Sequence, residues 1–541
     1  MSHEWEAVTH NSQLKTQNKK IMQRDGALES LWQHDQPDYA NEDKQFEDKV
    51  YDVLIVGGGI TGVSTAYLLQ KNGMSCVLAE GATLGFGTTG GTTAHLNTIM
   101  DTSYPEIEKK FNRHAAQTIA DSTKLAIHFI ETTTKTLGID CDFEYKNAYL
   151  LANNDDQSKE LDNIVSISKE VGIEIDYTNK IPAPVPFDNA AIIRNQAQFN
   201  PIKYLFGVAD GFRSFRGVLL QNCFVSDVKE ETEDTLLVAT TRGKIRARKI
   251  IYATHIPPGV NLLHLRCAPY RSYVLAVELE NEQSYPDALI YDMEEPYNYY
   301  RTQEVEGKRY LIFGGKDHKT GHEENLKDRF KQLEQYLNQF FSIKSINYFW
   351  SSQYYEPADG LPYIGNLPAH DGRYFVATGF GGNGMIYGTL AAIIMFELIV
   401  RNNFKYPLAE LLDPNRLKPV AGFSNFVKEG ADVAAKWLGG HLTSHSIDNL
   451  ASITPGDAQV VKYNHEDVAL YRDGEGKLHA VNPTCTHLQC KVKWNDAEHS
   501  WDCPCHGARY STEGKVLTGP ANRNLDYIIV DELMREHTDD E

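Results

Sequence analysis

The sequence predicts an α/β domain of the Rossmann type with an inserted antiparallel α+β domain, followed by a smaller all-β domain. A buried strand, a glycine-rich turn, a helix and a second strand follow one another from residue 51. Later apolar runs are separated by helical and hairpin-like stretches, and from about residue 443 the chain becomes β-rich and gathers four of its eight cysteines. The expected units are a polar N-terminal arm at 1–48, an α/β body at 49–400, a linker at 401–442 and the all-β domain at 443–541.

Composition and charge narrow the class of protein. The chain of 541 residues carries 53 Lys and Arg against 73 Asp and Glu, a net charge of −20 that repels phosphate backbones, so we expect no nucleic-acid partner. The first fifty residues lack the basic start and apolar core of a secretory signal, which favours a cytoplasmic location. The apolar run at 385–400 contains Glu397 and is shorter than the roughly 20 residues of a membrane span, so it predicts a buried helix.

The N-terminal arm is polar and mixed in charge, which is typical of a solvated segment. Leu31 and Trp32 are the apolar residues in it that can dock on the body.

The first strand–turn–helix unit carries a dinucleotide-binding pattern. Gly57, Gly59 and Gly62 satisfy G-x-G-x-x-G between a strand and a helix, and Glu80 closes the second strand. The glycines permit a tight turn, a close approach of the backbone to a pyrophosphate and close packing of helix on strand, while the carboxylate can accept from ribose hydroxyls. The pattern therefore predicts a bound dinucleotide.

A second match, at Gly379, Gly381 and Gly384, also lies between a strand and a helix. No strand and no acid at the ribose position follow it, so we reject a second dinucleotide site. The free N–H groups and positive dipole end of this helix suit an anionic group such as the electron-rich edge of a reduced flavin.

These motifs, with GTTGGTTAHL, KIIYATH and PADGLPYIG in the same order, resemble the FAD-dependent oxidoreductases related to D-amino acid, glycine and sarcosine oxidases over roughly residues 50 to 400. The resemblance implies FAD lying along the fingerprint and hydride transfer to the flavin. The further positions that it places at FAD are Thr88, Thr89, Val225, Gly381, Gly384 and Met385.

The C-terminal cysteines and histidines form two metal-ligand pairs, Cys485-x-His487 and Cys503-x-x-His506. Two Cys and two His can bind either zinc or an iron–sulfur pair. Each pair carries a further cysteine that tetrahedral zinc does not need, which favours a cluster.

The cysteine-rich stretch resembles the Rieske [2Fe-2S] domain of cytochrome bc complexes over about residues 443 to 541. The resemblance implies that Cys485 and Cys503 hold one iron and that His487 and His506 hold the other. It also implies a disulfide between the remaining two cysteines of the cluster, Cys490 and Cys505, and a proline loop at 518–521.

Together the two modules predict a converter of electron pairs into single electrons, because a flavin takes a hydride whereas a [2Fe-2S] cluster carries one electron. The expected function is dehydrogenation of a small amine or amino acid, with a protein or quinone as one-electron acceptor. Arg301 is the candidate for binding a substrate carboxylate. The alternative is an electron-transfer protein without a small-molecule substrate. A Rieske oxygenase and a nicotinamide-dependent reductase fit the motif order less well.

Overall fold

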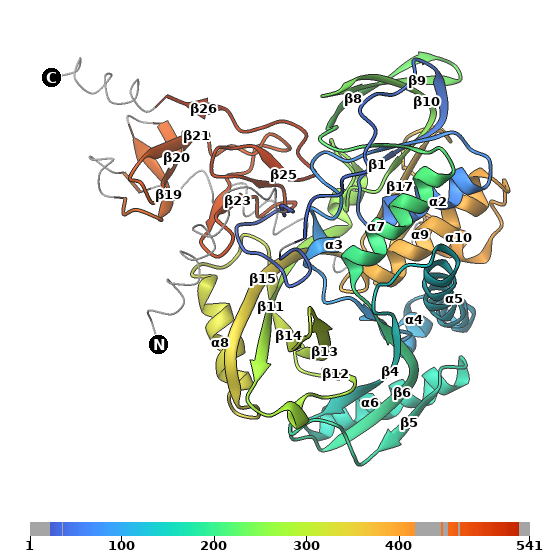
Figure 1. Ribbon diagram of the computed structural model, residues 1–541, viewed down its shortest axis with the longest axis vertical. Helices are drawn as coiled ribbons and strands as arrows, with labels where there is room; N and C mark the ends of the chain where they lie inside the picture. The colour runs from blue at the N-terminus through green and yellow to red at the C-terminus, as the bar shows by residue number, and fades with distance from the viewer. Residues whose placement is uncertain (1–21, 35, 417–444, 447–452, 464–465, 530–541) are drawn as a thin grey trace.

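The computed structural model describes residues 22–34, 36–416, 445–446, 453–463 and 466–529. Figure 1 shows a nucleotide-binding body, a large sheet beside it and a C-terminal β domain that lies against both. Across these ranges, no helix combines the length and the apolar character that crossing a membrane requires.

The nucleotide-binding body is built on a sheet with the order β16-β17-β10-β1-β2-β7. Pairing is parallel from β17 to β7, and both faces of its strands are buried, as expected for a parallel sheet. The strands are β1 (Val50–Val56), β2 (Cys76–Ala79), β7 (Val218–Leu220), β10 (Gly243–Tyr252), β16 (Tyr363–Asn366) and β17 (Tyr374–Thr378), with β8 (Val225–Thr232) and β9 (Thr235–Thr240) as an antiparallel extension.

Helices α2, α5, α7 and α9 pack together in this body (Figure 1). Most side chains of α9 are buried, which explains its continuous apolar run and confirms a buried helix there. In α5, the Asn112 side chain accepts from the Ala115 N–H and Gly138 ends the helix with φ 64°. The helices are α2 (Ile60–Lys71), α3 (Thr88–Gly91), α4 (Tyr104–Lys110), α5 (Arg113–Leu137), α7 (Pro201–Ser214), α9 (Gly384–Ile399) and α10 (Pro407–Leu411).

The inserted domain is a nine-stranded sheet with the main order β15-β11-β14-β13-β12-β4-β6-β3. All its pairings are antiparallel except that of β4 with β12, so the sheet is mixed. Its long strands β11, β14 and β15 form one side of the cavity described below. The elements are β3 (His95–Leu96), β4 (Glu144–Ala152), α6 (Asp155–Glu170), β5 (Ile175–Thr178), β6 (Asn189–Gln198), η1 (Leu262–Leu265), β11 (Cys267–Leu279), η2 (Glu282–Ser284), β12 (Leu289–Asp292), β13 (Tyr299–Val305), β14 (Lys308–Lys319), α8 (Lys327–Leu337) and β15 (Ile343–Pro357).

The C-terminal domain contains two small sheets, β18-β19-β20-β21-β26 and β22-β23-β24-β25. A separate apolar cluster around Trp501 and Tyr510 packs beneath the cysteine-rich loops. The strands are β18 (His445–Ser446), β19 (Ala458–Tyr463), β20 (Glu466–Arg472), β21 (Leu478–Val481), β22 (Lys493–Asn495), β23 (Ser500–Asp502), β24 (Arg509–Tyr510), β25 (Val516–Thr518) and β26 (Tyr527–Ile528).

The arm and the connecting segment are more firmly packed than their composition predicts. Leu31 and Trp32 are buried, together with the charged Arg24 and Asp25, so the described part of the arm from residue 22 to 34 is not a solvated tail. Residues 401–416 also pack on the body, where Arg416 pairs with Asp359 at 2.8 Å. The expected linker from residue 417 to 442 lies outside the described residues.

Candidate functional site

The fingerprint turn is packed so closely that it accepts only glycine at two positions. A Cβ atom at Gly62 would overlap the Gly57 carbonyl oxygen, and one at Gly57 would overlap the Ala253 carbonyl oxygen. Gly57 also has φ 113°, a conformation that L side chains rarely adopt. The turn is thus a backbone cradle of the kind that receives a pyrophosphate at a helix N-terminus.

Glu80 lies at the end of β2, beside this cradle. Its carboxylate accepts from the Gly58 N–H at 2.6 Å and from the Ala82 N–H at 2.7 Å. Burial raises its pKa from the usual value, although the backbone donors oppose that effect. The side chain is therefore held in place beside the cradle, where the sequence pattern expects a ribose.

A single cavity of about 900 Å³ extends from the fingerprint to the inserted sheet and to the C-terminal domain. This volume is at the upper end of the range for ligand pockets. Of the predicted FAD positions, those that line it are Gly57, Gly59, Glu80, Thr88, Thr89, Val225, Gly381, Gly384 and Met385. Gly62 is not among the lining residues, since it packs beneath Gly57.

The loop before α9 also faces the cavity, and one of its backbone donors is already used. The Gly382 N–H donates to Asp101 Oδ2 at 2.6 Å, and the Asp101 N–H donates to Asn383 Oδ1 at 2.9 Å. A carboxylate of the chain itself therefore occupies part of the site that we expected for an anionic group.

Arg301 does not line the cavity, and this corrects the expected carboxylate-binding role. Its guanidinium is fully buried and donates to the carbonyl oxygens of Ala94 and Phe199 and to Gln303 Oε1. The side chain also packs over the Trp32 ring. Arg301, which lies in β13 of the inserted sheet, therefore contacts both the arm at Trp32 and the loop that contains Ala94.

The four predicted cluster ligands come from two loops that a disulfide ties together. Cys490 and Cys505 form that disulfide, so they cannot act as thiolate ligands, although their sulfurs lie within 4.8 Å of Cys503 Sγ. Cys485 and Cys503 remain free thiols and are buried. The buried ring nitrogens without a hydrogen-bond partner in the described structure include Nδ1 of His487 and both nitrogens of His506.

Such orphaned nitrogens are costly to bury unless they bind something. Two thiols and two imidazoles are therefore available to hold a metal cluster. The Tyr510 hydroxyl also lies 3.2 Å from Cys485 Sγ.

The cluster loops face the nucleotide-binding body and the inserted sheet. His487 Nε2 lies 3.1 Å from the Gly259 carbonyl oxygen, and the His264 ring lies 4.6 Å from the His487 ring. The Tyr355 hydroxyl donates to the His506 carbonyl oxygen at 3.2 Å. The two histidines predicted to bind the cluster, His487 and His506, are thus in contact with the rest of the chain.

A short chain of contacts connects these loops to the cavity. Thr88 Oγ1 donates to the Gln353 carbonyl oxygen at 3.1 Å and lies 3.2 Å from His255 Nδ1. The Gln353 side chain donates to the Gly507 carbonyl oxygen at 2.9 Å, next to His506. Sequence reasoning missed Gln353 and Tyr355, because nothing in their strand indicates a partner in another domain.

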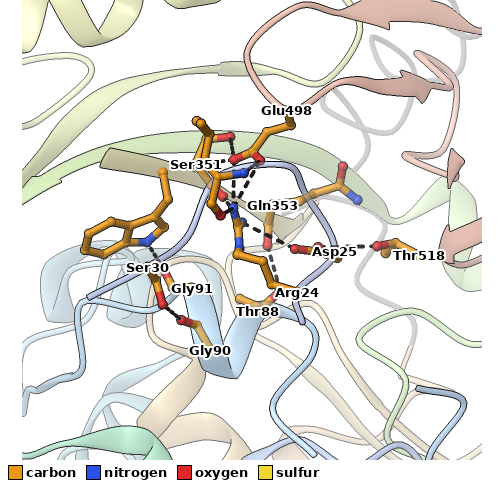
Figure 2. Close-up of polar contacts among 12 residues, drawn as sticks. Arg24, Asp25, Ser30, Thr88, Gly90, Gly91, Ser351, Gln353, Glu498 and Thr518 are labelled. Atoms are coloured by element: carbon orange, nitrogen blue, oxygen red, sulfur yellow. Dashed lines mark hydrogen bonds and ion pairs between the residues drawn. The ribbon is translucent and has the colours of Figure 1, made fainter. Parts of the chain in front are cut away.

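The N-terminal arm lies at the junction of the three bodies (Figure 2). Arg24 is 3.0 Å from Glu498 of the C-terminal domain and donates to the Ser351 carbonyl oxygen of the inserted sheet. Asp25 pairs with Arg509 of the C-terminal domain at 2.9 Å. All four of these charged side chains are buried.

Electrostatics keep the acids of this junction ionised. Burial by itself raises the pKa of Asp25, but Arg509, Arg24 and Arg271 outweigh it and hold the pKa below its usual value. The same arginines lower the pKa of Glu498 against the effect of its burial. The junction is therefore a set of paired charges whose members depend on one another.

This arrangement defines a nucleotide-cofactor oxidoreductase domain joined to an iron–sulfur domain. Residues 52–398 match the family of FAD dependent oxidoreductases, and residues 444–529 match the Rieske [2Fe-2S] domain. The chain belongs to that oxidoreductase family and carries a Rieske domain at its C-terminal end. Its cofactors are accordingly FAD and a [2Fe-2S] cluster, which decides against the zinc alternative.

Similar proteins are of two kinds: one matches nearly the whole chain, and others match about two thirds of it. YhfW of Bacillus subtilis, named as a Rieske 2Fe-2S iron-sulfur protein, is 33% identical over 487 residues, which cover 90% of this chain and 94% of that protein. Gamma-glutamylputrescine oxidoreductase of Escherichia coli is 24% identical over 67% of this chain and 86% of its own length. Glycine oxidase from Geobacillus kaustophilus has the same fold, with a TM-score of 0.56, 19% identity and coverage of 68% of this chain and 99% of that structure.

Proposed function

We propose that the chain is a dehydrogenase that oxidises a small amine or amino acid at a C–N bond and delivers the electrons one at a time to a protein or quinone. The observation that carries this proposal is the shared cavity. Gly57 and Gly59 of the fingerprint and residues 516–519 of the Rieske domain line the same space. This contact supports a reaction in which the domain that accepts the electrons lies next to the cavity where the substrate is oxidised.

FAD supplies the two-electron acceptor, and the Rieske cluster supplies the one-electron carrier. The cluster ligands in this proposal are Cys485, His487, Cys503 and His506. The backbone cradle and Glu80 hold the dinucleotide in this proposal. The hydrogen bonds from Thr88 to Gln353 and from Gln353 to Gly507 connect the cavity wall with the cluster loops. The reaction removes two electrons and two protons from the C–N unit, and two equivalents of a one-electron acceptor balance it.

A Cys503→Ser variant tests the electron exit. We expect the variant to retain FAD and its reduction by substrate under anaerobic conditions, because the fingerprint has a separate core. Turnover with a one-electron acceptor such as ferricenium should stop. Undiminished turnover without the cluster would contradict the proposal.

A screen of amines, amino acids and N-methyl amino acids for anaerobic bleaching of the flavin tests the substrate side. Bleaching by at least one compound supports a dehydrogenase. If no member of the panel bleaches a flavin that dithionite reduces, the alternative electron-transfer protein is the better description.

A further inference from the structure

The wall that the inserted sheet gives to the cavity is rich in tyrosine. Tyr297 and Tyr299 lie with ring centroids 5.5 Å apart, and Tyr270 stacks on Tyr354 at 5.9 Å. These four rings and Tyr291 all line the cavity. The faces of tyrosine rings attract cations, most strongly where water is excluded.

The charged side chains on this wall are acidic. Asp317 Oδ2 accepts from the Tyr354 hydroxyl at 2.8 Å, whereas its buried Oδ1 has no hydrogen-bond partner in the described structure. Asp101 lies close enough to influence Asp317, and its Oδ1 accepts from the Tyr297 hydroxyl at 3.2 Å. Glu356 lines the same space.

Asp317 is surrounded by groups that do not neutralise it. Burial raises its pKa to about 6, the hydroxyls of Ser272 and Tyr354 oppose that rise and Asp101 adds to it, so the carboxyl is mostly ionised at neutral pH. The other titratable groups that face it are the tyrosines at 297, 299 and 354, whose own pKa values burial raises and which therefore stay neutral. A buried carboxylate that has hydroxyl donors but no cation beside it is a favourable partner for a ligand ammonium group.

A basic group is missing from this wall. No lysine or arginine of the described residues lines the cavity. Two histidines do, His95 and His255, and burial lowers the pKa of both, to about 4 in His255 and well below the usual value in His95. The cavity therefore offers negative charge and aromatic faces but no positive partner for a carboxylate.

We infer that the substrate is a cationic alkyl amine without a carboxylate, whose ammonium group lies among the tyrosine rings and donates to Asp317; this inference rests on the proposed function and narrows it. In a diamine, one nitrogen is held as the ammonium and the other reacts as the neutral amine. That amine loses two electrons and two protons to become an imine, which water hydrolyses to an aldehyde and ammonia. The one-electron acceptor takes the electrons.

Pairs of compounds that differ only in a carboxylate test this inference on the holoenzyme. Putrescine is compared with ornithine, and cadaverine with lysine, by anaerobic bleaching of the flavin. We expect each diamine to bleach the flavin at concentrations at least about tenfold lower than its amino acid, since like charges in a half-buried site repel. Equal or better reduction by ornithine or lysine would overturn the inference and leave amine dehydrogenation standing.

A binding measurement decides the point even if none of these compounds is oxidised. Benzyltrimethylammonium and phenylacetate have similar size and opposite charge, and each is titrated against the visible spectrum of the bound flavin. We expect the cation to perturb the spectrum and the anion not to do so. Binding of phenylacetate in preference to the cation would refute the inference, whereas failure of every amine and amino acid to reduce the flavin would refute only the proposed function.

Two variants locate the site. Asp317→Asn keeps the shape and removes the charge, so the Kd of benzyltrimethylammonium should rise about 10- to 100-fold, because the Coulomb attraction between the carboxylate and the cation is lost. Tyr299→Leu removes one aromatic face and should also weaken the cation. Asp156→Asn, at a carboxylate that is 93% exposed on α6, is the matched control and should change nothing. Unchanged affinity in both cavity variants would place the cation elsewhere and contradict the inference.

Discussion

Replacing Arg24 by methionine would leave Glu498 buried without its nearest cation. The guanidinium lies 3.0 Å from both carboxylate oxygens of Glu498 and also donates to the carbonyl oxygens of Leu28 and Ser351. Glu498 is 1% exposed, so water cannot take over the role of the arginine. The change therefore removes contacts among the arm, the inserted sheet and the Rieske domain at once.

Breaking a buried ion pair by removing one partner costs about 3 to 5 kcal/mol. Because each 1.4 kcal/mol is about a factor of ten, the ratio of docked to undocked arm should fall by roughly two to three and a half powers of ten. The Ala27 N–H, which donates to the Glu498 carbonyl oxygen at 3.1 Å, reports this equilibrium directly. Its protection against hydrogen exchange should fall by the same factor.

The matched control is Glu47→Gln. Glu47 pairs with Lys49 at 2.6 Å, but its side chain is 74% exposed, and such pairs contribute little to stability. Protection at Ala27 should stay as in the parent protein. A second comparison is the double variant Arg24→Met with Glu498→Gln, in which no charge is left alone, and which should be less damaged than the sum of its single changes.

Exchange at Ala27 that is unchanged in the Arg24→Met variant would refute the reasoning. Strict additivity in the double variant would also refute it, since the cost would then not come from a stranded charge.

Three further predictions concern the cradle, the disulfide and the cavity. Gly62→Ala should lose FAD, measured as the ratio of flavin absorbance to protein, because its Cβ would overlap the Gly57 carbonyl oxygen; full flavin content would contradict the packing argument. Alkylation of unreduced protein followed by mass mapping should leave Cys490 and Cys505 unmodified, and labelling of both thiols would count against the bond. Because the carboxylate form of Asp317 holds the cation and burial raises its pKa to about 6, affinity for benzyltrimethylammonium should be constant above that pH and fall about tenfold per pH unit below it; the same inflection in Asp317→Asn would show that another group is responsible.

The fingerprint and the cluster motif could be predicted because each combines residues that are close in sequence. Gly57, Gly59 and Glu80 are placed by one strand–turn–helix–strand unit, and their spacing alone indicates a dinucleotide. Two loops contain all four predicted cluster ligands, so short spacings again indicate the chemistry. Such local patterns carry the backbone geometry with them.

The junction and the substrate wall depend on contacts between distant parts of the chain. Arg24 and Asp25 look like solvated charges in a polar segment, because their partners lie in another domain. Arg301 illustrates the opposite error, since an arginine beside a strand of the inserted sheet suggested a carboxylate site, whereas its Nη1 and Nη2 groups donate to two backbone carbonyl oxygens and to Gln303. Asp317 could not be recognised in the sequence, because it lies beside the tyrosines only through the pairing of β14 with β11 and β13 and of β11 with β15.

The pairing of Arg24 with Glu498 joins positions that are 474 residues apart, and that of Asp25 with Arg509 joins positions 484 apart. During synthesis the chain emerges from its N-terminal end, so the arm is made first, but its partners are among the last residues to appear. The two ion pairs with Glu498 and Arg509 can therefore form only late, whereas the hydrogen bond from Trp32 to the Thr92 carbonyl oxygen joins segments that are both made early. A chain interrupted before residue 498 would lack both partners and would leave Arg24 and Asp25 with only each other, at 3.3 Å, so these two ion pairs can form only in a chain that has been completed beyond Arg509.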